Sequence, residues 1–331
     1  MIKYQDFKKK RRFAYEQVVP ALKRVGLHDK AKKILLCSDF YRVAVCTECK
    51  TAHFAGSISC KDKFCPVCQK KRSLLWLTKL LPICNTLLSH GSHLNMLTYT
   101  IRVTDGMSLK TALNILLDSF RYMTNGHKQS AKIYNELILG GVRSLEVKIG
   151  ENKETGQLSG LWHPHFHILV CTHGKMGYKQ MQKILYDLWN NALRTVTHSK
   201  EAHCGSVRIS SIKAKNDQEL LNGLLEVVKY MTKFDWQGEN VYELVTTLHK
   251  QRMQNTFGNF KYLLSDAQIE HEMNKSYTEV VDTFCAVCGN HEFAEVDMFN
   301  TGNLQLFDLR HKHSDYLDIK DDDLVMYEDE D

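Results

Sequence analysis

Two neighbouring β-strand patterns joined by a polar loop constrain the fold of this chain more than any other feature. Residues 142–149 and 161–170 alternate apolar with polar side chains, which is the period of a strand that buries one face. The loop between them, GENKETGQLSG, is polar throughout most of its length. Strands joined in this way pair antiparallel, because a parallel pair needs a longer crossover, usually a helix. The pattern therefore excludes a doubly wound parallel sheet and predicts an α+β fold.

Further segments with strand or helix periodicity support the α+β prediction. Alternation of β-branched and aromatic residues predicts strands at residues 93–103 and 205–212. Amphipathic spacing predicts helices at residues 7–35, 71–88, 107–124, 177–194 and 217–234. We divide the chain into a basic helical arm (1–35), a cysteine module with a packing helix (36–88), a central α+β domain (89–265) and a C-terminal extension (266–331).

Three histidines, His163, His165 and His167, occupy alternate positions of the strand at 161–170. Alternate residues of a strand share a face, so the imidazoles point one way while Phe166 and Ile168 point the other. Imidazoles at this spacing lie about 7 Å apart along the strand and can chelate one divalent ion. Histidines on a merely solvated face are the alternative interpretation. We favour a metal site with His165 and His167 as ligands.

Glu146 is the candidate third ligand. It lies on the face of the first strand opposite to Leu145 and Val147, and in a hairpin this polar face adjoins the histidines. His163 is the competing third ligand. Imidazole and carboxylate ligands suit Mg²⁺ or Mn²⁺ acting as a Lewis acid on a phosphate, with positions left open for the substrate.

A tyrosine on the predicted helix 217–234 is the candidate nucleophile. Glu226, Tyr230 and Lys233 lie at i, i+4 and i+7 and so share one helix face. Tyrosine with its ordinary pKa of about 10 is a poor nucleophile, so it needs a metal-polarised phosphate or a nearby cation, which Lys233 could supply. Glu226 could act as a general base for water or as a second nucleophile. The alternative interpretation is a half-buried tyrosine between two surface charges.

The eleven cysteines indicate metal binding, since disulfides are rare inside cells. The motif Cys46-x2-Cys49-x15-Cys65-x2-Cys68 fits the spacing of a structural zinc site with four thiolate ligands. Cys60 or His53 inside the loop could replace one ligand, and unrelated buried cysteines are the alternative interpretation.

A second cysteine pair, Cys285-x2-Cys288, forms half of such a site. His291 or another chain could complete it. The alternative interpretation is a pair of thiols that bind no metal.

The charge distribution favours a polyanionic partner. The formal net charge is +6, but residues 316–331 carry −7, so the rest of the chain carries +13, of which +8 lies in the first 33 residues. Such a surface suits nucleic acid, because each neutralised phosphate releases counterions, although a solvated basic helix is the alternative. No apolar run reaches the roughly 18–20 residues of a membrane span, and the basic start lacks a secretory signal. We therefore expect a cytoplasmic protein without a membrane partner.

Three motifs, in order, resemble those of the HUH endonucleases, in particular the replication initiators of small rolling-circle plasmids of Gram-positive bacteria. Leu97-Thr98-Tyr99-Thr100 resembles the first motif, and the histidine pair of WHPHFHIL resembles the second. EVVKYMTK resembles the third, which carries the nicking tyrosine with a glutamate four residues earlier in one branch. Cys60-x4-Cys65-x2-Cys68, before a basic helix with a tryptophan, resembles the N-terminal cysteine module of that family. The resemblance covers about residues 40–260.

This resemblance implies an HUH-type five-stranded antiparallel sheet with helices packed on one face and the metal on the other. It implies that Tyr230 nicks one strand of a specific origin, stays bound as a 5′-phosphotyrosine and frees a 3′-hydroxyl primer. The expected partners are single-stranded or hairpin origin DNA with flanking duplex, a host helicase and a polymerase. The expected ions are catalytic Mg²⁺ or Mn²⁺ and structural Zn²⁺. The pair Cys285-x2-Cys288 and the acidic tail depart from the family pattern.

Two other functions are compatible with these motifs. A rolling-circle transposase of the same superfamily shares the chemistry and can also couple a cysteine module to it. A non-catalytic, zinc-stabilised nucleic-acid-binding protein would instead use the histidines as a second structural metal site.

Overall fold

The chain folds into two compact units, one formed by residues 1–68 with 273–331 and the other by residues 69–272. We call them the smaller and the larger unit. The computed structural model describes residues 12–37, 40–57, 59–125, 128–151, 158–172, 176–199, 204–212, 217–228, 239–274 and 287–299.

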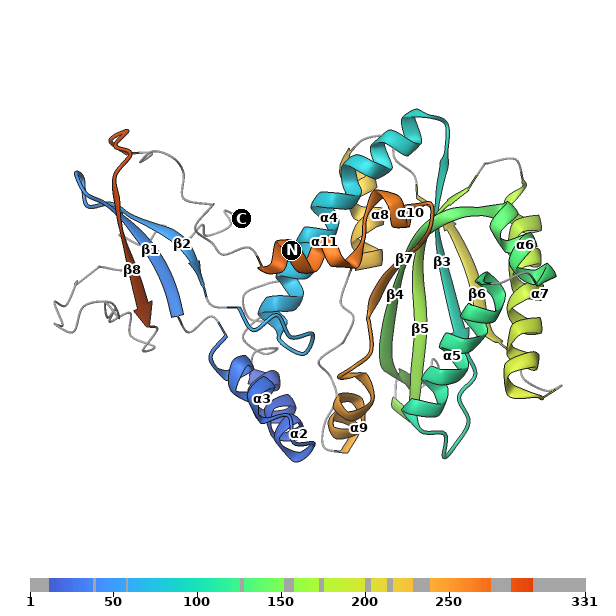
Figure 1. The fold of residues 1–331 in the computed structure, drawn as a ribbon. Helices are drawn as coiled ribbons and strands as arrows, with labels where there is room; N and C mark the ends of the chain where they lie inside the picture. The colour runs from blue at the N-terminus through green and yellow to red at the C-terminus, as the bar shows by residue number, and fades with distance from the viewer. Residues whose placement is uncertain are drawn as a thin grey trace. The chain divides into compact units, whose positions relative to one another are not determined.

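The larger unit is built on a five-stranded antiparallel sheet in the order β6-β3-β5-β4-β7 (Figure 1). Its strands are β3 (His93–Ile101), β4 (Ile138–Glu151), β5 (Leu158–Thr172), β6 (Cys204–Ser211) and β7 (Gln254–Gly258). The predicted strands at 142–149 and 161–170 form the pair β4 and β5, with β5 at the centre of the sheet. The predicted α+β fold is therefore confirmed.

Three helices, α5 (Leu109–Thr124), α6 (Gln129–Leu137) and α7 (Tyr178–Thr197), cover one face of this sheet (Figure 1). Helix α5 begins where the Ser108 side chain accepts a hydrogen bond from the amide of Thr111, and its apolar residues then recur at helical spacing. Phe120 of α5 meets Phe166 of β5 edge to face, with ring centres 5.3 Å apart. This face forms the core, and the expected placement of helices on one face is confirmed.

The register of β4 and β5 decides which side chains face away from this core. Leu145 pairs with Phe166, and Glu146 pairs with His165. Because side chains alternate along a strand, Phe166 enters the core while His165, His167 and Glu146 lie together on the opposite face. The fold thus separates an apolar face from a metal-ligating one.

The other helices of this part of the chain are α4 (Pro66–Ser89), α8 (Asp217–Val228), α9 (Glu239–Leu248), α10 (Phe260–Leu263) and α11 (Asp266–Asn274). Helix α8 packs against β4 and β5 and lies across the sheet from α5 and α7 (Figure 1). The hydroxyl of Ser73 on α4 donates a hydrogen bond to the carbonyl of Val228, at the end of α8 (2.9 Å). Among the described residues, none of the helices is long and apolar enough to cross a bilayer.

Glu243 connects α9 to the sheet and to α5. Its carboxylate accepts hydrogen bonds from the indole of Trp162 on β5 (2.7 Å) and from the backbone amide of Leu109 (2.6 Å). The chain is therefore anchored before and after residues 229–238. These lie outside the described residues and include the last six residues of the predicted helix 217–234.

The smaller unit contains a three-stranded antiparallel sheet in the order β2-β1-β8. Its strands are β1 (Phe40–Cys46), β2 (Ala52–Ser57) and β8 (Phe293–Phe299). β8 comes from the C-terminal part of the chain, so this sheet joins two segments that are far apart in sequence. The sequence patterns did not predict these strands.

The predicted single helix at residues 7–35 is wrong, because the chain turns at Gly26. The described part contains η1 (Ala14–Val18), α2 (Val19–Arg24) and α3 (His28–Leu35). Gly26 has a φ of +78°, which glycine adopts without steric cost. The amides of Gly26 and Leu27 donate to the carbonyls of Lys23 and Leu22, at 3.0 and 2.8 Å. This pair of bonds closes the C-terminus of α2.

The close approach of β4 to β5 at Gly141 yields a testable prediction. A Cβ atom at Gly141 would overlap the backbone oxygen of Leu169 on β5. Gly141→Ala should force the strands apart and lower the free energy of unfolding by about 2 kcal/mol or more, because backbone cannot move aside as a side chain can. Thermal unfolding followed by circular dichroism should show a Tm lower by about 4–8 °C.

Gly177→Ala is the matched control for this substitution. Gly177 precedes α7 with a φ of −63°, and nothing lies within 4 Å of a Cβ built on it. This variant should lose no more than about 1 kcal/mol, the cost of alanine in place of glycine at a helix N-cap. Equal stabilities for the two variants would contradict the contact at Gly141.

Candidate metal centres

Three ligand atoms converge on the face of the larger sheet that points away from the core. The Oε2 atom of Glu146 lies 3.1 Å from Nε2 of His165 and 3.0 Å from Nε2 of His167, and the two Nε2 atoms are 3.1 Å apart. β4 supplies the carboxylate and β5 the imidazoles, because the strand register places Glu146 opposite His165. The structure thus brings together the three residues predicted as the divalent-ion site.

The imidazole rings are oriented by their other nitrogen atoms. Nδ1 of His165 lies 3.1 Å from the carbonyl oxygen of His163. A carbonyl only accepts, so Nδ1 carries the proton and Nε2 of the neutral ring presents a lone pair. Nδ1 of His167 lies 3.3 Å from the hydroxyl of Thr98 on β3. Such outer contacts fix the tautomer and direct a ring at a metal ion.

The donor set and its spacing fit one divalent ion. A carboxylate oxygen beside imidazole lone pairs is repulsive unless a cation or proton lies among them. Neighbouring ligands of an octahedral ion with bonds of about 2.1 Å lie about 3.0 Å apart, close to the distances in this group. Burial would raise the pKa of Glu146, but hydrogen bonds from His165 and His167 lower it well below its ordinary value when a proton lies between each ring and the carboxylate, and a bound cation would act in the same direction. The carboxylate is therefore ionised at neutral pH.

His163, the competing third ligand, lies beside this group without belonging to it. Its ring centre is 5.1 Å from that of His165, and it pairs with Lys148 across the strands. Burial and the neighbouring His165 and Lys148 lower the pKa of His163 to about 4. The geometry favours Glu146 over His163 as the third ligand.

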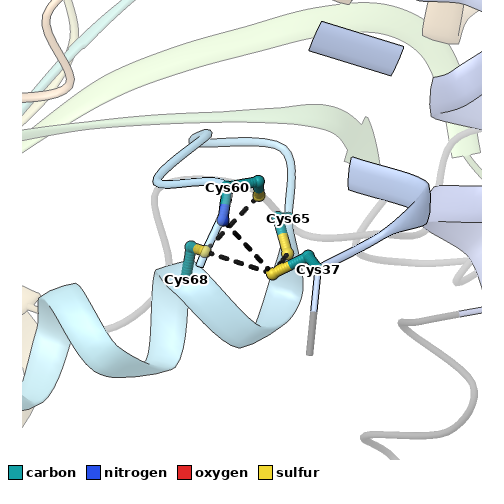
Figure 2. A group of neighbouring side chains, drawn as sticks. All are labelled: Cys37, Cys60, Cys65 and Cys68. Carbon is teal, nitrogen blue, oxygen red and sulfur yellow. Dashed lines mark hydrogen bonds between the residues drawn. The ribbon is translucent and has the colours of Figure 1, made fainter. Parts of the chain in front are cut away.

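Four cysteines of the smaller unit form a second group, shown in Figure 2: Cys37, Cys60, Cys65 and Cys68. The Sγ–Sγ distances are 3.5 Å from Cys37 to Cys68, 3.5 Å from Cys37 to Cys65 and 3.4 Å from Cys60 to Cys68. Zinc–sulfur bonds of about 2.3 Å place tetrahedral ligands about 3.8 Å apart, so the group fits one zinc ion.

Backbone amides also support this cysteine group. The amide of Lys61 donates to Sγ of Cys68 (3.2 Å), and the amide of Cys60 donates to Sγ of Cys37 (3.5 Å). Hydrogen bonds from the thiols of Cys37, Cys60 and Cys65 lower the pKa of Cys68. The same contacts raise the pKa of Cys60 and Cys65, so the cysteines share protons in the absence of an ion, and thiolate is the form that binds metal.

The grouping Cys46, Cys49, Cys65 and Cys68 predicted from the spacing needs correction, because the structure divides these residues. Cys65 and Cys68 join Cys37 and Cys60, while Cys46 and Cys49 lie with Cys288 in a third group. Spacing identifies pairs of ligands, but the fold decides which pairs meet. Sequence reasoning named Cys60 only as an alternative and missed Cys37, which stands outside any Cys-x2-Cys pair.

The third group lies where β1 ends. Sγ of Cys46 is 3.5 Å from Sγ of Cys288, and the three ligand atoms of Cys46, Cys49 and Cys288 lie within 4.8 Å of one another. Burial would raise the pKa of Cys46, but hydrogen bonds from the amides of Cys49 and Glu48 lower it to about 6. Cys285, predicted as the partner of Cys288, lies outside the described residues.

Other predicted residues also fall outside the described part of the chain. Tyr230 and Lys233 do so entirely. Glu226 belongs to α8 and His53 to β2, but their side chains are not among those described. The roles assigned to these four residues remain predictions.

The inclusion of Cys37 in a metal site can be tested by zinc content. Cys37→Ala should lower the thiolate-bound zinc of the purified chain by about one ion and destabilise the smaller unit, because structural zinc contributes directly to folding. Elemental analysis of dialysed protein measures the loss. Cys84→Ala is the matched control, since Cys84 is buried in α4 outside every cysteine group. Full zinc content in Cys37→Ala would contradict this ligand set.

Comparison with known proteins adds two family matches and several relatives. A family model described as a transposase zinc-binding domain matches residues 10–89, which contain all four cysteines of Figure 2. This match supports zinc as their ion. A family model described as a replication protein matches residues 51–295. No solved structure matches the chain significantly.

The curated relatives are proteins named rep. The chain is 26% identical over 221 residues to one from a Bacillus species, 26% over 227 residues to one from Streptococcus pneumoniae and 28% over 195 residues to one from Bacillus amyloliquefaciens. These matches cover 62%, 65% and 55% of this chain, and 66%, 65% and 52% of the relatives. The match to the replication-protein model covers most of the chain. The chain therefore belongs to the replication-protein family, and its resemblance to rolling-circle Rep proteins of Gram-positive bacteria is confirmed.

Proposed function

We propose that this chain initiates rolling-circle replication of a plasmid by nicking one DNA strand with the help of a divalent ion. The observation that carries the proposal is the convergence of Glu146, His165 and His167 within 3.1 Å on one face of the sheet. In a replication protein, such a set suits Mg²⁺ or Mn²⁺ with positions left for substrate. When bound, this ion would withdraw charge from a phosphate oxygen and ease attack at phosphorus.

The proposed reaction is a transesterification at one phosphodiester. The phenol oxygen of Tyr230 attacks phosphorus, the bond from phosphorus to the 3′ oxygen breaks, and a 5′-phosphotyrosine forms. The phenol loses a proton and the released 3′ oxygen gains one, so the step balances without an external energy source. The free 3′-hydroxyl then primes synthesis. Attack by a 3′-hydroxyl on the same linkage would reverse the step and join the strand.

The anchoring of the chain around residues 229–238 supports Tyr230 as the nucleophile. Helix α8 ends at Val228, two residues earlier in the sequence, and packs against the two strands that carry the Glu146 group. After this segment, Glu243 of α9 binds to the indole of Trp162 on β5. Both helices contact β5, the strand that carries His165 and His167, and this favours delivery of Tyr230 to a phosphate bound at the Glu146 group.

Two further residues have proposed roles in this step. Lys233 would stabilise the tyrosinate that attacks, since a nearby cation lowers the pKa of a phenol. Glu226 would act as a base for water or as a second nucleophile in releasing the strand. The basic body of the chain, at +13 without its acidic tail, suits origin DNA in single-stranded or hairpin form with flanking duplex. A host helicase and a polymerase complete the proposed set of partners.

Substitution of the nucleophile provides the first test. Tyr230→Phe should abolish the covalent adduct with a single-stranded origin oligonucleotide, because phenylalanine has no oxygen to attack phosphorus. Binding should change little. Denaturing gels report the adduct, and fluorescence anisotropy reports binding. Tyr262→Phe is the matched control, because Tyr262 is 89% exposed. Peptide mapping of the wild-type adduct to any other residue would overturn the assignment of Tyr230.

Substitution of the proposed metal ligands provides the second test. Glu146→Ala and His167→Ala should each lower cleavage about a hundredfold or more, since the ion supplies several kcal/mol of charge stabilisation in the transition state. His163→Ala should retain most activity, because His163 lies outside the ligand group. Cleavage rates measured against Mn²⁺ concentration, and with EDTA, separate weaker metal binding from lost chemistry. A larger loss in His163→Ala than in Glu146→Ala would reverse the ligand assignment.

A second candidate function is a rolling-circle transposase of the same chemistry. The match of residues 10–89 to a transposase zinc-binding domain favours it. The substrate distinguishes the two, because a replication initiator cuts at a plasmid origin while a transposase cuts at the ends of its element. If the purified chain with Mn²⁺ cuts neither a plasmid origin nor element ends, the result favours a non-catalytic, zinc-stabilised nucleic-acid-binding protein.

A further inference from the structure

A second thiolate group in the smaller unit extends beyond the match to a zinc-binding domain. It contains Cys46 and Cys49, at the end of β1, and Cys288, in the C-terminal part of the chain. The match to a zinc-binding domain ends at residue 89, so it does not contain Cys288. Cys46 and Cys288 are 242 positions apart in sequence, yet their Sγ atoms lie 3.5 Å apart.

Backbone pairing explains why these cysteines meet. β1 pairs antiparallel with β8, from Phe40 opposite Phe299 to Cys46 opposite Phe293. Past the end of the ladder, the amide of Thr47 donates to the carbonyl of Glu292 (3.1 Å). The two chain segments therefore run side by side to the place where the thiols converge.

The turn between Cys46 and Cys49 has the form of a metal-binding knuckle. Lys50 follows Cys49 with a φ of +62° and donates its amide to the carbonyl of Cys46 (3.1 Å). This tight turn holds Cys46 and Cys49 on one side. Across from it, the side-chain amide of Asn290 donates to the hydroxyl of Thr47 (3.0 Å) and approaches Sγ of Cys46 (3.7 Å). Polar contacts thus fix both segments that carry the thiols.

We infer that Cys46, Cys49 and Cys288 bind a second structural zinc ion that joins the C-terminal segment to the N-terminal zinc module. Zinc–sulfur bonds of about 2.3 Å place tetrahedral sulfur ligands about 3.8 Å apart, near the separation of Cys46 and Cys288. The sequence places Cys285 at ligand spacing from Cys288, outside the described residues. The two zinc sites of the smaller unit thus take ligands from residues 37–68 and from Cys288.

Zinc counting in the full-length chain tests this site. A thiol-specific mercurial reagent displaces only thiolate-bound zinc, so an ion at Glu146 and the histidines does not enter the count. The wild type should release about two ions, and Cys46→Ala and Cys288→Ala about one each. The double variant Cys37→Ala with Cys288→Ala should release none, while Cys84→Ala, outside both groups, should release two. Release of two ions by Cys288→Ala would overturn the proposal.

Alkylation of the unaltered chain provides a test that does not depend on how variants fold. The side chain of Cys288 is exposed, so an unligated thiol there would react rapidly with iodoacetamide. The site predicts protection of Cys288 in the zinc-loaded protein and rapid reaction of Cys46, Cys49 and Cys288 after chelation. Equal rates at Cys288 before and after chelation would contradict the site. Neither test depends on the proposed nicking activity.

Discussion

The antiparallel pairing of β4 with β5 is the interaction on which the candidate active site depends. Glu146 and His165 belong to one face only because they are register partners. A slip of one residue would turn every side chain of one strand to the other face, placing a carboxylate against Phe166 and the core. Gly141 permits the close approach of the strands, because a Cβ there would overlap the backbone of β5. The same backbone hydrogen bonds thus determine both core packing and ligand geometry.

Much of this sheet could be predicted from local pattern. The alternation around His165 and His167 shows that both imidazoles lie on one face of the strand, because side chains alternate between the two faces. Whether Glu146 or His163 completes the ligand group was harder to predict, because alternation gives the face of each side chain but not the register between two strands. That register is set by pairs distributed along both strands, from Ile138 opposite Thr172 to Glu151 opposite Leu158. The histidine strand can therefore be predicted from local sequence, but its meeting with Glu146 depends on the tertiary pairing of two strands.

The cysteines could be predicted to bind metal, but their grouping into sites could not. Their number and spacing indicate metal binding, because paired thiolates at short spacing are what a zinc ion requires. The partners of each pair are decided by long-range strand pairing, which no local pattern records. β8 pairs with β1 although the two strands are far apart in sequence, and this pairing brings Cys288 to Cys46. Cys37 belongs to no pair at all, and only the fold places it 3.5 Å from Cys68.

The chemistry of the donors separates the structural ions from the proposed catalytic one. A closed set of thiolates holds zinc in four-coordinate form and leaves no position for substrate. The carboxylate and two imidazoles on the sheet are harder ligands, and an ion held by these three residues would keep positions for phosphate oxygens. Zinc at the cysteines would therefore support the fold without competing for DNA. A metal at Glu146 would lie on strands that α8 contacts directly, and α8 leads into the segment that carries Tyr230, so the ligand group and the proposed nucleophile are positioned by the same two strands.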